Sequence, residues 1–286
     1  MSRSSSKRLS EEIGGNREEI GTLPYYFSAV YLSYLNRGVS LFKQIHKMKY
    51  KFATIGLAPL FIVQGLYVRH VTPKLPEPSG ERSGIYGHGP LLSLLILGDS
   101  AASGVGVPTQ SQALSGQLIT ELGSEYRVSW KLIAQNGHRA KDVIAELKIA
   151  MPETFDIVVT SIGVNDVTHG TNCNKWISQQ CQIIELLQSK FHSQHILLSS
   201  LPPMHFFPAL PQPLRWYLGL RAKCFNGALE KCVEDFDRCE IVTINYPFDD
   251  VYIAKDGFHP GALAYSIWAS HIADIIRSRL DRTGRK

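Results

Sequence analysis

The feature that most constrains the fold is an alternation of short apolar runs with amphipathic segments, which begins at residue 91. Residues 91–97 (LLSLLIL) form a continuous apolar run, which is typical of a strand buried on both faces of a sheet. Further strands are expected at 127–134, 155–161, 195–200 and 240–244. Helices are expected at 110–122, 139–150, 175–190, 215–236 and 261–280. This order predicts an α/β fold with a five-stranded parallel sheet covered by helices on both faces.

The chain before this sheet divides into three segments by composition. Residues 1–50 are polar and basic, and we expect them to be partly disordered. Residues 51–70 are apolar and are expected to form a helix. Residues 71–90 are rich in Pro, Gly and Ser, which is typical of a linker. One folded domain is therefore expected at 91–282, a length that can enclose a hydrophobic core.

The uncharged run at 52–68 has three interpretations. A membrane span needs about 20 apolar residues, with about 17 as the lower limit, and Pro59 and Gln64 weaken this run further. It is either a signal anchor, a helix lying on the membrane or on the folded domain, or a cleaved signal. Met48 and the Lys-Tyr-Lys-Phe that follows it would themselves form a short charged n-region, so the start is expected at Met1 or at Met48. Lysines precede the run, so an inner-membrane anchor would place the domain outside. The other expected location is cytoplasmic.

Composition excludes several classes of protein. With 44% hydrophobic residues, the chain has enough apolar material for a core and is not disordered as a whole. The net charge of +5 comes without a dense Lys/Arg patch in the last two-thirds of the chain, so we expect no nucleic-acid partner. No His or Cys group has the spacing of a metal site, and we expect no metal and no cofactor.

The five cysteines leave the redox environment open. Cys224 and Cys232 lie on one expected helix about 12 Å apart, which is beyond the reach of about 7 Å between the Cα atoms of a disulfide. A reducing compartment is the simpler interpretation. Pairing of Cys232 or Cys239 with Cys173 or Cys181 would instead be compatible with export.

Chemically useful residues follow four of the expected strands. The segments are Gly98-Asp99-Ser100, Asn136-Gly137, Gly163-Val164-Asn165-Asp166 and Asp256-Gly257-Phe258-His259. In an open α/β sheet, ligands bind beyond the carboxyl ends of the strands. Each segment alone is more often a simple turn. Their shared position at strand ends favours one common site.

This set of residues contains what a serine hydrolase needs. Ser100 is the candidate nucleophile, His259 the candidate base, and Asp256 the group that orients the base. The N–H groups of Ser100 and Gly137 and the side chain of Asn165 are candidate donors to an oxyanion. Asp99, Gly163 and Asp166 are expected to support the turns.

The four segments resemble, in family order, the four sequence blocks of the SGNH (GDSL-type) hydrolases. The resemblance covers about residues 90–280. It implies a flavodoxin-like three-layer α/β/α sandwich, and it implies the same roles for Ser100, Asp256, His259, Gly137 and Asn165. The first block reads GDSAASGVG, which departs mildly from the many members with an aromatic or longer polar residue after the Ser.

An apolar segment at 201–221 follows the fourth strand and is expected to overhang the site. Met204, Phe206, Phe207 and Trp216 are its candidates for a substrate wall that holds an acyl chain. The alternatives are simple packing onto the domain and a surface that contacts lipid.

These features predict a serine esterase or lipase-like hydrolase that cleaves acyl or acetyl esters, with a small-molecule or lipid-like substrate. The apolar segment 201–221 and the apolar N-terminal run favour lipid-like acyl esters, so the chain is expected to be lysophospholipase-like. The apolar run at 52–68 adds a potential membrane contact. The alternatives on the same site are an acyltransferase and a carbohydrate O-acetyl esterase. A membrane-tethered binding protein without turnover is the alternative from a different class.

Overall fold

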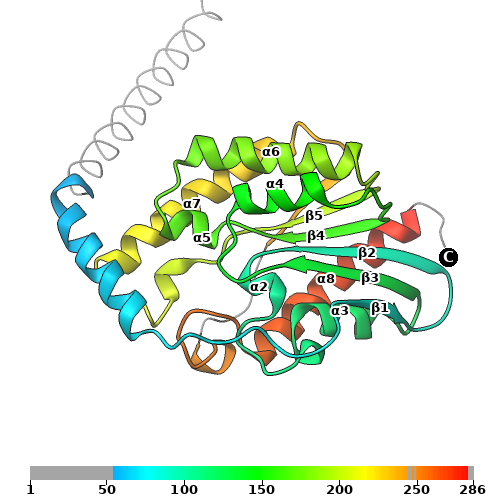
Figure 1. The fold of residues 1–286 in the computed structure, drawn as a ribbon, viewed down its shortest axis with the longest axis horizontal. Coiled ribbons are helices and arrows are strands. Elements are labelled where there is room, and N and C mark those ends of the chain that lie inside the picture. The colour runs from blue at the N-terminus through cyan, green and yellow to red at the C-terminus, as the bar shows by residue number, and fades with distance from the viewer. Residues whose placement is uncertain (1–53, 244–246, 248, 283–286) are drawn as a thin grey trace, which may run out of the picture. The chain divides into compact units, whose positions relative to one another are not determined.

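The computed structural model describes residues 54–243, 247 and 249–282. Its centre is one sheet with the strand order β1-β3-β2-β4-β5-β6 (Figure 1). The parallel strands are β2 (Leu91–Gly98), β3 (Arg127–Ala134), β4 (Ile157–Ser161), β5 (His195–Ser199) and β6 (Cys239–Val242). Counted along the chain, they lie in the order 2-1-3-4-5, which is the flavodoxin-like arrangement. The topological switch point therefore lies at the end of β2, between β3 and β4.

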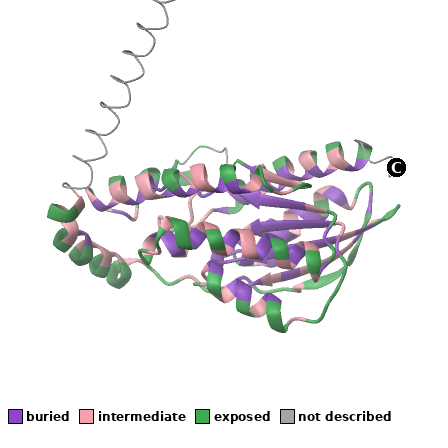
Figure 2. Ribbon diagram, turned by 90° about the horizontal axis from the view of Figure 1, so that it is seen from above, coloured by how far each residue is buried: buried purple, intermediate pink, exposed green. Residues whose placement is uncertain are grey.

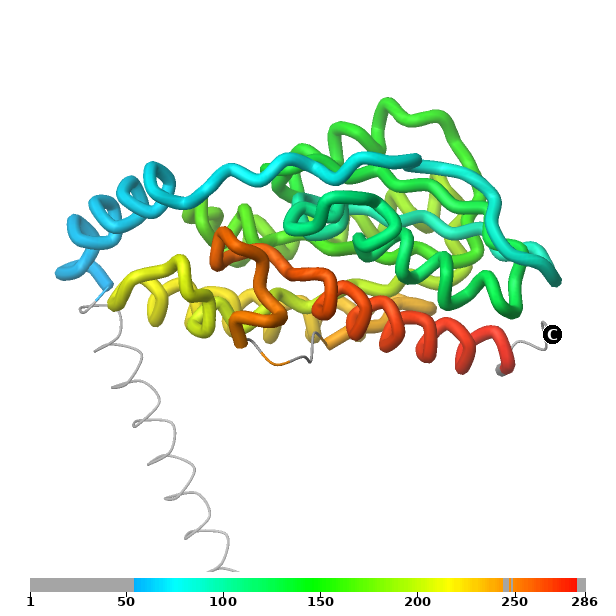
Figure 3. The backbone as a smooth tube through the Cα atoms, turned by 90° about the horizontal axis from the view of Figure 1, so that it is seen from below, coloured from blue at the N-terminus to red at the C-terminus, as the bar shows by residue number. Residues whose placement is uncertain are grey.

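The five predicted parallel strands are present, and the sheet has a sixth strand that was not predicted, because residues 71–90 are not only a linker. Strand β1 (Ser83–Tyr86) pairs antiparallel with β3, with Ser83 opposite Lys131. All four residues of β1 are exposed, so no apolar pattern marks this strand in the sequence. Figure 3 shows the light-blue to cyan chain before β1 running along the domain. The side chain of Glu77 fixes part of this segment by accepting a hydrogen bond from the N–H of Asn136.

Helices cover both faces of the sheet, as predicted (Figure 1). Helices α3 (Leu114–Leu122) and α8 (Ala262–Arg282) pack together on one face. The other face carries α4 (Ala140–Ile149), α6 (Cys173–Ser189) and α7 (Leu214–Val233). The short helices α2 (Ser100–Ser103) and α5 (Val164–Thr168) follow β2 and β4, and the 3₁₀ turns lie at Gln110–Gln112, Met204–Phe206 and Asp250–Tyr252.

The core lies between the sheet and these helix layers. Figure 2 shows the strands as the buried centre, with the exposed residues on the outer sides of the helices. In β2, residues 94–97 are fully buried, which explains the uninterrupted apolar run in the sequence. The predicted helix at 110–122 starts later, at Leu114, because residues 110–112 form a 3₁₀ turn. The amide of Gln110 fixes that turn by donating to the carbonyl of Ser103.

The chain divides into two compact units, Met1–Pro59 and Leu60–Lys286. Of the first unit, residues 54–59 are described and are helical; the predicted polar extension at 1–50 lies outside the described residues. The helix Thr54–Val71 is long and apolar enough to cross a membrane by length and composition alone. From Leu60 onward it belongs to the second unit. There, the side-chain amide of Gln64 donates to the carbonyl of Gln212 at 2.7 Å.

A disulfide joins Cys181 in α6 to Cys232 in α7, with Cα atoms 6.7 Å apart. It is one of the cross-pairings that the sequence left open. The Sγ atoms of Cys173 and Cys224, on the same two helices, lie 3.8 Å apart as free thiols.

Candidate active site

Ser100 lies where β2 passes directly into a helix. Asp99 caps α2, and its carboxylate accepts a hydrogen bond from the N–H of Ala101 at 3.1 Å. Ser100 is therefore the first residue of that helix, where a backbone N–H has no partner within the helix. The side chain sits at the edge of the sheet with 8% of the residue exposed.

His259 and Asp256 reach Ser100 from the loop before α8. The Nε2 atom of His259 lies 2.9 Å from the Oγ of Ser100, and its Nδ1 lies 2.5 Å from Oδ2 of Asp256. The structure thus brings together three side chains separated by up to 159 positions in the sequence. The hydroxyl, the imidazole and the carboxylate form one hydrogen-bonded chain, as proton transfer from a serine requires.

Asp256 is held as a carboxylate at the end of this chain. Its Oδ1 accepts hydrogen bonds from the N–H groups of Phe258 and His259, each at 3.0 Å. Burial raises the pKa of Asp256, but its hydrogen bonds to His259, the charge of that histidine and the bond from Phe258 outweigh the burial. The net pKa lies below its ordinary value, so Asp256 stays ionised beside the imidazole.

The three candidate oxyanion donors come from three strand ends at the switch point. Gly137 follows β3 with φ +86°, a conformation that side chains rarely adopt, and open space surrounds the position where a Cβ would lie. Asn165 in α5 donates one amide hydrogen to the carbonyl of His138 at 3.0 Å. Because an amide has two hydrogens, the second is available to a ligand in the cavity that Asn165 lines.

The three supporting residues brace the turns around these donors. Asp166 accepts a hydrogen bond from the N–H of Ala140 at 3.0 Å, which ties the start of α4 to α5. Gly163 has φ +139°, and a Cβ there would meet Trp176 at 2.9 Å. Burial raises the pKa of Asp99 to about 6, despite the hydrogen bond from Ala101. Asp99 is thus a buried acid directly behind the serine.

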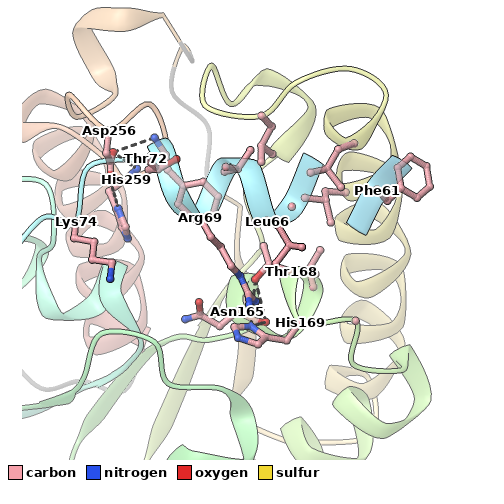
Figure 4. A pocket seen from close by; sticks show the side chains of 18 of the residues that line it. Phe61, Leu66, Arg69, Thr72, Lys74, Asn165, Thr168, His169, Asp256 and His259 are labelled. Atoms are coloured by element: carbon pink, nitrogen blue, oxygen red, sulfur yellow. Dashed lines mark hydrogen bonds and ion pairs between the residues drawn. The ribbon is translucent and has the colours of Figure 1, made fainter. Parts of the chain in front are cut away.

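A cavity of about 680 Å³ opens beside the three-residue chain (Figure 4). Its polar end contains Asn165, His169, Asp256 and His259. The apolar lining comes from two parts of the chain that are distant in the sequence. These residues are Phe61 and Leu66 of the first helix, and Leu210, Leu214, Tyr217 and Leu218 around the start of α7.

The four residues predicted to form the substrate wall do not line this cavity. Met204 and Phe207 are buried, and Phe206 and Trp216 are exposed by 53% and 38%. The expected segment does reach the cavity, but with other side chains, because the start of α7 turns Leu214, Tyr217 and Leu218 toward it.

The sequence also did not predict that the helix before the linker would line the cavity. Arg69 and Lys74 line it as well, and so does His169, which lies beside the third motif. The polar Gln64 inside an apolar run was the available signal, because a buried or half-buried amide needs a partner. Within the described residues, no group of three or more His, Cys, Asp or Glu side chains could hold a metal ion.

The sequence from 96 to 267, more than half of the chain, matches the model of the GDSL-like lipase/acylhydrolase family. The chain belongs to this family. It is therefore a GDSL-family ester hydrolase. No curated protein sequence gives a significant match.

Solved structures share the fold of this GDSL-family chain at low sequence identity. A member of the lipolytic protein G-D-S-L family from Veillonella parvula has a TM-score of 0.50 at 15% identity, over 65% of this chain and 98% of that one. A carbohydrate esterase family 2 enzyme from Corynascus thermopiles (Myceliophthora fergusii) has a TM-score of 0.51 at 15% identity, over 73% of this chain and 69% of that one. A family two carbohydrate esterase from Clostridium thermocellum has a TM-score of 0.51 at 16% identity, over 67% of this chain and 66% of that one. At such identities the likeness concerns the α/β fold alone.

Proposed function

We propose that this GDSL-family hydrolase cleaves acyl esters of medium or long chain, with Ser100 as nucleophile. The observation that carries the proposal is the hydrogen-bonded chain from Ser100 Oγ to His259 at 2.9 Å and on to Asp256 at 2.5 Å. The cavity beside it has an apolar end that suits the chain of a fatty acid.

In the first half of the reaction, Ser100 Oγ attacks the ester carbonyl while His259 Nε2 takes the hydroxyl proton. The ionised Asp256 stabilises the imidazolium that forms. The N–H groups of Ser100 and Gly137 and the amide of Asn165 donate to the oxyanion of the tetrahedral intermediate. His259 then gives its proton to the leaving alcohol, and the acyl group remains on Ser100.

In the second half, water attacks the acyl-enzyme and His259 takes one of its protons. Collapse of the second tetrahedral intermediate releases the carboxylic acid, and the proton returns to Ser100 Oγ. An alcohol in place of water would give the acyltransferase reaction on the same site.

We further propose that the helix Thr54–Val71 contacts the surface of a membrane and does not cross it. Phe61 is 8% exposed against the domain, and Gln64 is hydrogen-bonded to Gln212 and Leu214. The described helix before Phe61, residues 54–60, would then be what remains for a span, about 10 Å against about 30 Å of hydrocarbon.

The outward side of this helix supports a contact with lipid. Leu60, Val63, Tyr67 and Val71 are at helical spacing and are all exposed. Three lysines precede the run, a charge that suits anionic headgroups. The observable consequence is that the full chain sediments with anionic vesicles, whereas Val63→Asp/Tyr67→Asp stays in solution. Equal sedimentation of the two would contradict the contact.

The hydrolytic function is tested by turnover of p-nitrophenyl esters with two to sixteen carbons, with Ser100→Ala as the control. We expect a maximum at medium or long chains that disappears in Ser100→Ala. Activity confined to acetate would indicate a carbohydrate O-acetyl esterase instead. Ester formation with an added alcohol, in excess over hydrolysis, would indicate an acyltransferase.

A further inference from the structure

Two cationic side chains line the cavity next to the proposed catalytic residues. Arg69 lies in the last turn of the first helix, and Lys74 follows it after Pro73. Figure 4 shows Arg69 pointing toward Asn165 and His169, while Lys74 lies on the side of His259. The cations therefore approach the reacting end of the cavity from two sides.

Within the part of the chain that the structure describes, no acidic side chain neutralises Arg69 or Lys74. Asp256 is the one carboxylate among the described lining residues, and it is occupied by His259 and by two backbone N–H groups. With two cations and one anion, the lining carries a formal charge of +1.

The opposite end of the cavity is apolar, so the cavity as a whole is amphipathic. Phe61 stands eight positions before Arg69 on the same helix, a rise of about 12 Å. Along this distance the lining changes from aromatic and aliphatic side chains to cations. A ligand that matches both ends has an apolar chain at one end and a negative group at the other.

We infer that the substrate is a single-chain acyl ester whose alcohol carries a phosphate, and this rests on the proposed acyl-ester hydrolysis. The acyl chain lies against Phe61 and Tyr217, the ester carbonyl lies at Ser100, and the phosphate lies between Arg69 and Lys74. The guanidinium of an arginine can hold two phosphate oxygens at once, and the lysine adds a point charge. Unpaired cations beside low-dielectric walls also attract anionic substrates to the cavity.

The test compares two esters that differ only in the phosphate, 1-octanoylglycerol 3-phosphate and 1-octanoylglycerol, both below the concentration at which they aggregate. The full chain is assayed as wild type and as the variants Arg69→Gln, Arg69→Lys, Lys74→Gln, Ser100→Ala and Arg127→Gln. Arg127 is the matched control, because it is an exposed arginine at the opposite end of the strand that leads to Gly137. Labelling of Ser100 by a neutral phosphonate reporter in each variant checks that the site is folded.

We expect wild type to prefer the phosphate ester by at least about 10-fold in kcat/KM. Arg69→Gln lowers kcat/KM for this ester about 10- to 100-fold, which is the usual loss for a hydrogen bond to a charged group. Lys74→Gln lowers it less, the neutral ester changes less than about twofold, and Arg127→Gln changes neither. Arg69→Lys keeps part of the preference for the phosphate ester, because lysine retains the positive charge but lacks the planar guanidinium that binds two oxygens.

Equal losses on both esters, or no loss on either, would overturn the inference while leaving acyl-ester hydrolysis in place. An Arg69 effect that appears only when the neutral ester is presented in anionic vesicles would also overturn it, because the cations would then bind the lipid surface. If wild type cleaves neither ester, or Ser100→Ala cleaves both, the proposed function fails together with the inference.

Discussion

The ring of Phe61 stacks on the ring of Tyr217, with centroids 4.6 Å apart and planes 9° from parallel. This contact joins the helix that precedes the linker to α7, and both residues line the cavity. A segment with the composition of a membrane anchor is thereby part of the wall around the proposed acyl site.

Removal of this contact should therefore change the selectivity for chain length. We expect Phe61→Ala to lower kcat/KM for p-nitrophenyl decanoate about 10-fold, because the methylene groups of the decanoyl chain lose apolar contact with the ring. The acetate ester, which does not reach Phe61, should change less than about twofold. The matched control is Tyr67→Ala on the same helix, a 61% exposed aromatic outside the cavity lining. Equal profiles for the two variants would contradict this assignment.

Asn165 should contribute to turnover and little to binding. Loss of one oxyanion donor typically lowers kcat about 10²- to 10³-fold, and we expect Asn165→Ala to fall in this range with KM changed less than about threefold. Asn174→Ala, an exposed asparagine at the start of α6, is the control. Undiminished kcat in Asn165→Ala would exclude Asn165 from the oxyanion hole.

Buried Asp99 should make stability depend on pH. Its pKa is about 6 in the fold and near 3.8 in a free chain, so the folded state binds the proton more tightly. Ionisation of the buried carboxyl lowers the free energy of unfolding. This loss is absent below about pH 4, grows as the pH rises to about 6, and stays constant above, at about 3 kcal/mol.

Compared with wild type, Asp99→Asn should therefore unfold at a higher urea concentration at pH 8 and at nearly the same urea concentration at pH 4. The amide oxygen can still accept the hydrogen bond from Ala101, so the helix cap is retained. Asp250→Asn, which changes an exposed aspartate, serves as the control and should show no such pH dependence. A variant that is destabilised at pH 8 would mean that Asp99 acts through its charge.

The disulfide between Cys181 and Cys232 should stabilise the pairing of α6 with α7. It closes a loop across 51 positions, and such crosslinks typically contribute about 2–4 kcal/mol. We expect Cys181→Ser/Cys232→Ser to lose that much free energy of unfolding in urea, and reductant to lower wild type to the same level. If reductant leaves the free energy of unfolding of wild type unchanged and no additional thiols can be titrated after reduction, the crosslink does not form in solution.

The sheet was predictable because the hydrophobic pattern of each parallel strand reflects which of its faces are buried. Strand β3 was predicted at 127–134 and has these bounds, and the uninterrupted run of β2 reflects a strand buried on both faces. β1 carries no such signal, because its four residues are exposed and show no buried face, although they pair with β3. The motif residues were predictable for a related reason, since parallel strands end at one edge.

The cavity wall was not predictable, because it depends on contacts over long sequence distances. The hydrogen bond between Gln64 and Gln212 spans 148 positions, and no periodicity within either segment indicates the partner. The wall residues predicted from 201–221 were large apolar side chains, whereas the cavity receives those that the rotation of α7 turns inward. Size and hydropathy in a loop therefore located the segment and not the residues.

The central claim is that Ser100 is the nucleophile, and mass spectrometry of the fluorophosphonate-treated enzyme tests it most directly. The account predicts one covalent adduct, located on Ser100 by peptide mapping, at a rate that falls at least about 100-fold in His259→Ala because the base is missing. Rapid labelling of another serine, or of Ser100 at an unchanged rate in His259→Ala, would contradict it.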